Sequence, residues 1–186
     1  MSAVDDILDF WFGTLDEHGC ASKEHQARWW KKDAAFDDEI RRRFADLHQA
    51  IRRGEHDDWL LEPRGRLAQV IALDQFPRNM FRGTAEMFAS DAQALRIAVD
   101  GIERGDDRAL PQDHRSFFYM PLMHSEDLAM QDRAVVMFAA LGSVKYAEMH
   151  RDIIRRFGRF PHRNRILGRE SSPEELEFLA QPGSSF

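Results

Sequence analysis

Two short segments of the sequence place an arginine and an asparagine side by side after a Phe-Pro pair. Arg78 and Asn79 follow the first pair directly, and Arg163 and Asn164 follow the second after one histidine. Arginine presents a rigid fork of donors that matches a carboxylate or a phosphate, while asparagine both donates and accepts. Proline lacks a backbone donor and restricts the residue before it, so both segments are predicted to end a helix. We take the two arginines and two asparagines as candidate ligand-binding residues.

A carboxylate, Asp74, lies at the end of the most apolar stretch of the chain, residues 67–73. A buried carboxylate without a partner is costly, so we expect a cation beside it. Arg78 follows one helical turn later and is the first candidate, and Arg163 is the second. Such a pair either takes part in ligand binding or only fixes the turn, and Asp74 joins the ligand-binding candidates.

The junction between two further predicted helices holds His124 and Glu126. Pro121 is expected to break one helix, and Ser125 is expected to cap the next. Histidine titrates near neutral pH and serves as an acid, a base or a metal ligand. His124, Glu126 and His162 are therefore the candidate catalytic residues, and the alternative is an ordinary helix cap with flanking polar groups.

No pattern in the sequence predicts a metal or a cofactor. The single cysteine, Cys20, excludes the paired-cysteine element that zinc deaminases require, and no two histidines have the spacing of a zincin. The spacing of His124, His150 and His162 selects no metal. Nucleophile elbows, phosphate-binding loops and dinucleotide fingerprints are also missing from the sequence.

Arginine is concentrated near the C-terminal end, while the chain as a whole is acidic. The concentrated arginines are Arg151, Arg155, Arg156, Arg159, Arg163, Arg165 and Arg169. The formal net charge is -6, so the surplus of acidic residues can pair with these arginines, or the arginines can attract an anionic ligand. Nucleic acid is not an expected partner of an acidic chain.

The composition is that of an ordinary globular protein. With 186 residues, 43% hydrophobic and 31% charged, the chain fits one domain covering residues 1–186. It has no apolar run of membrane-spanning length, and its N-terminus does not resemble a signal peptide, so no membrane partner is expected. A single cysteine is typical of a reducing compartment, and we expect a cytoplasmic protein.

Apolar residues recur with a helical period along nearly the whole chain, which predicts an all-α fold. The expected helix starts are Asp33, Pro63, Ser90 and a capping box at Ser172–Glu175, and the expected helix ends are Gly54, Gly105 and Gly158. No segment predicts a strand. Short connections favour antiparallel helical hairpins, and residues 181–186 are predicted to form a loose tail.

Several motifs together resemble one protein family. They are Phe10-Trp11-Phe12-Gly13, Arg28-Trp29-Trp30, the segments 73–79, 121–126 and 157–164, Leu167-Gly168-Arg169 and the Ser-Ser-Pro-Glu-Glu start of the last helix. In this combination the chain resembles the bacterial domain-of-unknown-function family 924 over nearly its whole length. Met123 stands where the resemblance leads us to expect a glutamate. The resemblance implies a fold similar to tetratricopeptide-repeat proteins, with stacked antiparallel helix pairs and a concave face, and it implies no established activity.

Two classes of function fit these residues. The first is a helical module that binds a small anionic molecule or a peptide in a polar groove. The second is a hydrolase-like enzyme in which His124 or His162 acts as the base and Glu126 or Asp74 orients it. Because no nucleophile is recognisable, we favour binding. A third possibility is an interaction scaffold whose polar clusters are purely structural, and the sequence indicates no oligomeric state.

Overall fold

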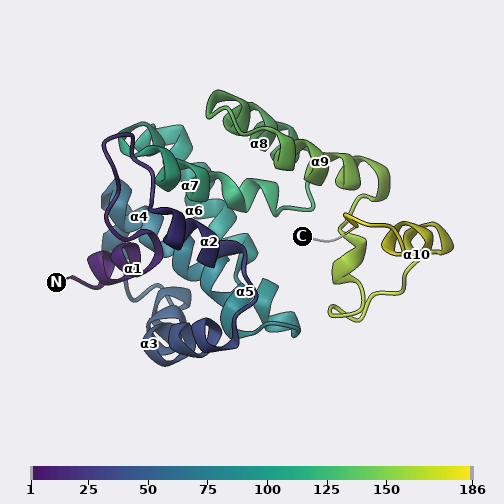
Figure 1. Ribbon diagram of the computed structural model, residues 1–186, viewed down its shortest axis with the longest axis horizontal. Helices are drawn as coiled ribbons and strands as arrows, with labels where there is room; N and C mark the ends of the chain where they lie inside the picture. The colour runs from purple at the N-terminus through teal and green to yellow at the C-terminus, as the bar shows by residue number, and fades with distance from the viewer. Residues whose placement is uncertain (1, 185–186) are drawn as a thin grey trace.

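The computed structural model describes residues 2–184, and every regular element in that range is a helix (Figure 1). The α-helices are α1 (Ala3–Phe12), α2 (Lys23–Trp30), α3 (Ala34–Arg52), α4 (Pro63–Val70), α5 (Phe76–Met80), α6 (Asp91–Arg104), α7 (Gln112–Met123), α8 (Leu128–Ala140), α9 (Lys145–Phe157) and α10 (Pro173–Leu179). Four 3-10 turns, η1 (Asp57–Leu61), η3 (Ala85–Phe88), η4 (Asp106–Ala109) and η5 (Pro161–Arg163), and a π-helical turn, η2 (Ile71–Gln75), complete them. The predicted all-α fold is confirmed.

Most of the predicted helix boundaries are also confirmed. The carboxylate of Asp33 accepts the backbone N–H groups of the first turn of α3, and Ser172 and Glu175 form the expected capping box of α10. Gly105 and Gly158 adopt left-handed conformations directly after α6 and α9. These short-range signals depend on neighbouring residues only, which is why they could be recognised in the sequence.

The core surrounds α4, in which every residue from Gly65 to Val70 is buried. α4 packs against α1, α6 and α7, and α8 and α9 extend from α7 as an antiparallel hairpin (Figure 1). Aromatic rings fill the space between these helices; the fully buried ones include Trp11, Phe12, Phe76, Phe117 and Phe118. A second, smaller apolar cluster around Ile154 and Phe160 fixes the C-terminal segment against α9. The tetratricopeptide-repeat-like stacking implied by the resemblance stays a prediction.

The prediction that Pro77 ends a helix is wrong. The chain stays helical from α4 through the π-turn η2 into α5, with Pro77 in the first turn of α5. A proline inside a helix clashes with the carbonyl four residues before it, here that of Leu73, and the wider π-turn accommodates the ring. The N–H of Phe76 donates to Ile71 O, five residues back, which leaves the carbonyl of Ala72 without its usual donor.

Side chains from α3 and from the loop before α6 satisfy the carbonyls that the π-turn releases. Nδ1 of His48 in α3 donates to Ala72 O at 2.9 Å. The hydroxyl of Ser90 donates to Leu73 O at 2.6 Å, replacing the N–H that Pro77 lacks. Ser90 is the N-cap residue of α6, as expected, but its hydroxyl makes no cap hydrogen bond because it donates to Leu73 O instead. These two side-chain donors replace the missing backbone N–H donors, so the π-turn can be buried without unsatisfied carbonyls at Ala72 and Leu73.

Two predictions at the next helix junction also need correction. Pro121 does not break its helix, because α7 continues through it to Met123. The cap of α8 is Asp127, whose carboxylate accepts from Ala129 N and Met130 N, and not Ser125. The residues of α7 from Pro121 to Met123 matter for the site, since the residue that follows them, His124, contacts Asp74.

Among residues 2–184, no helix has the length and apolar character needed to cross a membrane.

Within the predicted tail, residues 181–186, Ser184 is buried and donates to Leu179 O at 3.1 Å. Residues 185 and 186 lie outside the described residues.

Candidate functional site

The π-turn directs the carboxylate of Asp74 into the protein, where its side chain is fully buried. Nδ1 of His124 lies 2.9 Å and 3.0 Å from its two oxygens. Nη1 of Arg78 is 3.2 Å from one oxygen, as the sequence predicted, and Nε2 of Gln75 donates to the other at 2.5 Å. The carboxylate therefore has a cationic partner and a histidine partner, and its burial is compensated.

A second carboxylate, Asp91 at the start of α6, joins two arginines. Arg78 donates two hydrogen bonds to it, both at 3.0 Å, and Nη1 of Arg163 lies 3.3 Å from one of its oxygens. The guanidinium of Arg163 lies over the rings of Phe88 and Phe160, 4.5 Å and 4.6 Å from their centroids. Two aromatic faces at this distance favour the cation.

One nitrogen of this buried guanidinium makes no hydrogen bond to the described residues. Nη2 of Arg163 donates to His124 O at 3.0 Å, but Nε has no hydrogen-bond partner within residues 2–184. The residue is only 7% exposed. Burial and the neighbouring charge of Arg78 lower the pKa of Arg163 to about 10, so it stays protonated at neutral pH. A buried N–H without an acceptor is costly, and it is the group in this cluster that an incoming acceptor would satisfy.

His124 and Asp74 have complementary protonation states at neutral pH. Burial raises the pKa of Asp74, but the charge of Arg78 and the contact with His124 outweigh it and hold the pKa at about 2. Burial lowers the pKa of His124, which leaves the imidazole neutral. Since Nδ1 donates to a carboxylate, Nε2 carries the lone pair, and no described residue forms a hydrogen bond with it. His124 therefore presents an oriented, available base.

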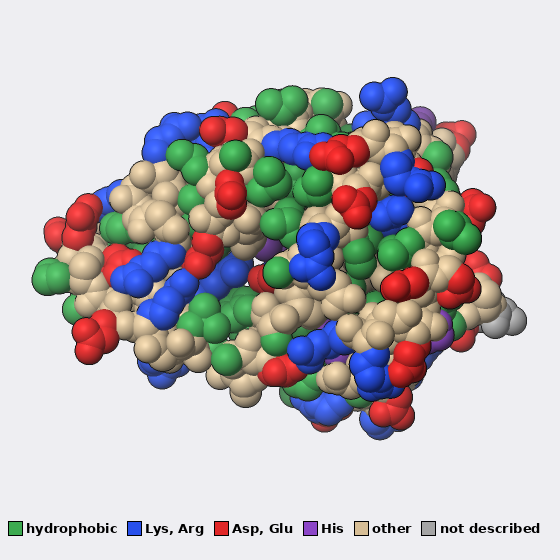
Figure 2. Space-filling model, turned by 180° about the vertical axis from the view of Figure 1, so that it is seen from behind, with side chains coloured by type: hydrophobic (Ala, Val, Ile, Leu, Met, Phe, Trp, Pro, Cys, Tyr) green, Lys and Arg blue, Asp and Glu red, His purple; other side chains and the backbone are tan. Residues whose placement is uncertain are grey.

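The cluster reaches solvent at three points. The side chains of Arg78, Asp91 and His124 are 18%, 19% and 15% exposed. Figure 2 shows a hollow on the face opposite that of Figure 1, where basic, acidic and histidine side chains meet. The partial exposure of Arg78, Asp91 and His124 gives solvent access to a cluster that is otherwise buried.

Glu126 belongs to a neighbouring cluster. Its carboxylate makes two hydrogen bonds with Arg169, at 2.7 Å and 2.9 Å, and accepts the backbone N–H of Phe160 at 2.8 Å. Burial raises the pKa of Glu126, but the pairing with Arg169 outweighs it and the pKa is lowered. The residue that orients His124 is thus Asp74, while Glu126 anchors the segment that carries Phe160.

The remaining candidates form no hydrogen bond with the Asp74 carboxylate in the described part of the chain. The amide of Asn79 donates to Gln75 O, and its oxygen accepts from Arg82. The amide of Asn164 bonds to Ser171 and Glu175, next to α10. The ring of His162 packs 5.5 Å from that of Phe160, and burial together with Arg163 lowers its pKa to about 4. Of the eight residues proposed from the sequence, Asp74, Arg78, His124 and Arg163 converge.

Sequence reasoning missed three members of the site. Asp91 appeared to be an ordinary acidic residue in the first turn of a helix, and Phe88 and Gln75 carried no separate signal. Their roles depend on how α6 and η3 are placed against the π-turn, which only the tertiary structure reveals. In the described part of the chain, no three His, Cys, Asp or Glu residues are arranged to hold a metal ion.

Comparisons with known proteins identify the family. The family model described as "Bacterial protein of unknown function (DUF924)" matches residues 7–183. A solved structure of a protein of unknown function from Agrobacterium tumefaciens is 47% identical, with a TM-score of 0.86, over 95% of this chain and 96% of that chain. No curated protein matches the sequence. The chain therefore belongs to the bacterial family of unknown function DUF924, as the sequence motifs indicated.

Proposed function

We propose that the protein binds a small anionic ligand, of the size of a carboxylate or a phosphate, at Arg163 and His124. The observation that supports this is the Nε–H of Arg163, which is buried and lacks an acceptor among residues 2–184. An anion oxygen placed there makes a charge-assisted hydrogen bond in a setting of low dielectric. The partly exposed side chains of Arg78, Asp91 and His124 supply the access from solvent.

The charges of the cluster set the conditions for binding. Asp74 and Asp91 balance Arg78 and Arg163, so the four groups carry no net charge while His124 is neutral. An anion therefore binds most tightly when His124 takes up a proton, and binding raises the pKa of His124. The small exposed area of the cluster favours a small ligand over a peptide, because only parts of Arg78, Asp91 and His124 reach solvent.

A thermal-shift screen with acetate, succinate and phosphate at pH 6 and pH 8 tests the proposal. We expect a saturable rise in melting temperature with at least one of these anions, larger at pH 6. Arg163→Gln removes the charge and should abolish the shift. Arg155→Gln is the matched control, because Arg155 is 56% exposed and pairs with surface carboxylates of α8 and α9. Equal shifts in both variants would exclude the proposed site.

The His124–Asp74 contact favours a second candidate, a hydrolase-like acid–base enzyme. In that case Nε2 of His124 removes a proton from a water molecule, Asp74 stabilises the imidazolium, and Arg163 binds an anionic substrate. NMR spectra of the protein incubated with carboxylate-bearing esters and amides test this candidate. The enzyme candidate requires that the unmodified protein hydrolyses one of these compounds, and that His124→Gln abolishes the hydrolysis but still binds the anion. Binding without any product formation would leave the binding function alone.

A further inference from the structure

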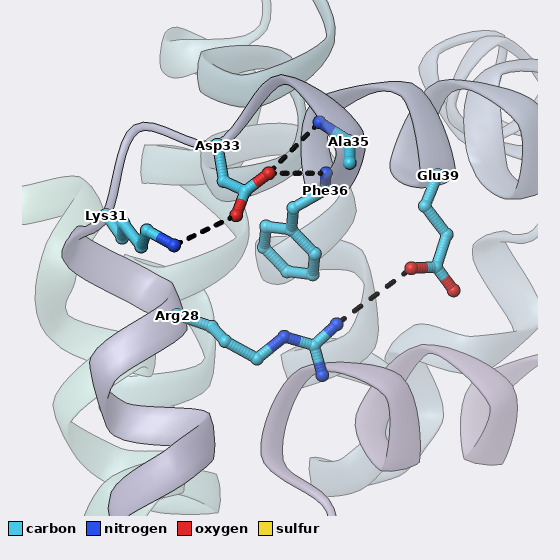
Figure 3. A pocket seen from close by; sticks show the side chains of 6 residues that line it. All are labelled: Arg28, Lys31, Asp33, Ala35, Phe36 and Glu39. Atoms are coloured by element: carbon cyan, nitrogen blue, oxygen red, sulfur yellow. Dashed lines mark hydrogen bonds and ion pairs between the residues drawn. The ribbon is translucent and has the colours of Figure 1, made fainter.

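Two pockets lie away from the Asp74 cluster. The charged groups of the first are paired with each other, whereas two carboxylates of the second have no basic partner among residues 2–184. The first, of about 250 Å³, lies between α2 and α3 (Figure 3). Its charged groups are paired with each other: Nζ of Lys31 is 3.2 Å from Asp33, and the guanidinium of Arg28 is 4.0 Å from Glu39 and stacks on Phe36. Such a self-neutralised pocket selects no ligand.

The second pocket is larger, about 580 Å³, and lies where the starts of α1 and α4 meet η1 and the end of η4. Its apolar walls come from Val4, Trp59, Pro63 and Leu110. Two exposed carboxylates, Asp58 and Glu62, lie on the same lining. An apolar pocket with a few polar groups is the usual form of a small-molecule site.

Buried side chains hold the Trp59 wall in place. Nη2 of Arg66 donates to Leu60 O at 2.8 Å, and Nε2 of Gln69 donates to His56 O at 2.7 Å, so α4 fixes the backbone on both sides of Trp59. Gly65 allows this close packing, because a Cβ there would lie 2.3 Å from Trp59 O. The cavity is thus part of the fold rather than a gap between mobile loops.

The charges of the second pocket are unbalanced. Neither Asp58 nor Glu62 has a basic group within 4.0 Å in the range that the structure describes, and the one lining cation, Arg64, is paired with Asp5 at 3.0 Å. The arginine–aromatic contacts of residues 2–184 all go to phenylalanine rings, and the ring that packs against Trp59 is that of His56, at 4.5 Å between centroids. Tryptophan is the aromatic side chain with the strongest attraction for cations.

We propose that this pocket binds an organic cation, a primary ammonium or guanidinium group carried on a short apolar stem. The charged head would pair with Asp58 and Glu62, and the stem would lie against Trp59 and Leu110. This site is independent of the anion site, since the two share no residue.

Titration of the ¹⁵N-labelled protein with n-butylammonium and with pentanoate tests the proposal, because the two probes differ in charge but share a similar stem. The reporter is the indole N–H signal of Trp59, assigned by its loss in Trp59→Phe. We expect a saturable shift with n-butylammonium and none with pentanoate. The double variant Asp58→Asn/Glu62→Gln should weaken n-butylammonium binding at least fivefold.

The control Glu24→Gln/Glu148→Gln removes the same amount of charge at two exposed carboxylates that have no basic group within 4.0 Å among residues 2–184. It should bind n-butylammonium as the unmodified protein does. Unchanged affinity in Asp58→Asn/Glu62→Gln, an equal loss in the control, or an equal response to pentanoate would each overturn the proposal.

Discussion

Nδ1 of His124 contacts both carboxylate oxygens of Asp74, at 2.9 Å and 3.0 Å, although 50 residues separate the two in the sequence. The contact exists because a π-turn directs Asp74 inward and because α7 runs through Pro121 to the residue before His124. Pro77 and Pro121, which the sequence predicts to end helices, thus lie inside helical segments. Because the chain stays helical at both prolines, Asp74 and His124 come into contact.

Removal of the Asp74 carboxylate should strongly destabilise the fold. Asp74→Ala leaves Arg78 and His124 beside a buried hole, and losing one partner of a buried ion pair costs about 3–5 kcal/mol. Urea unfolding at pH 7 measures the change. Asp132→Ala is the control, because its carboxylate is 55% exposed and pairs loosely with Arg155 at 3.6 Å, so its loss should cost about 1 kcal/mol or less. Equal costs would contradict the role assigned to Asp74.

The π-turn should depend on Ser90. Ser90→Ala leaves the carbonyl of Leu73 without its hydroxyl donor, at an expected cost of about 1–3 kcal/mol. Pro77→Ala returns a backbone N–H near the same carbonyl, so the double variant should lose less than the sum of the two single losses, by more than about 0.5 kcal/mol. A double-mutant cycle in urea gives this coupling. Strictly additive losses would mean that the hydroxyl does not replace the N–H of Pro77.

Stability should fall as the pH is lowered from 7 to 5. Burial lowers the pKa of His114 to about 4 and that of His150 to about 3. In the unfolded chain both titrate near about 6.5, so below that pH the unfolded state binds more protons and the free energy of unfolding decreases. We expect a loss of about 2 kcal/mol or more by pH 5. His150→Gln should reduce the slope, and a flat profile in the unmodified protein would show that these histidines are protonated when folded.

Glu126 should act as an anchor rather than as a catalyst. Glu126→Gln weakens the pair with Arg169 and the hydrogen bond from Phe160 N, at an expected cost of about 1–3 kcal/mol. Hydrogen exchange of the Phe160 amide reports the change directly and should accelerate. Glu174→Gln, at an exposed pair with Arg156, is the comparison and should leave that amide protected. Unchanged exchange in Glu126→Gln would contradict the anchoring role.

The sequence predicted the parts of the structure that depend on local chemistry. Helical periodicity gave the all-α fold, and Asp33, Gly105 and Gly158 marked helix boundaries through backbone geometry alone. The pairing of Asp74 with Arg78 was also predictable, because the two lie one helical turn apart. These inferences need no knowledge of what packs against each helix.

The rest of the site could not be predicted because it depends on partners distant in the chain. Pro77 stays within a helical segment only because His48 and Ser90 accommodate the displaced carbonyls. Asp91 joins the site only because α6 lies against the π-turn. In the sequence, Pro77 predicts a helix end and Asp91 predicts an ordinary helix start. In the tertiary structure, Pro77 lies inside a helical segment and Asp91 pairs with two arginines.

The most direct test of anion binding follows the NMR signal of the Arg163 Nε–H group, which has no acceptor among residues 2–184. In ¹H–¹⁵N NMR spectra optimised for arginine side chains, the Nε–H signal of Arg163, assigned by its loss in Arg163→Gln, is followed while succinate or phosphate is added at pH 6. Formation of a hydrogen bond to an anion predicts a saturable downfield proton shift for Arg163, with no such shift for Arg155. An Arg163 signal that does not move when the anions reach tens of millimolar, or that moves no more than that of Arg155, would contradict the proposed site.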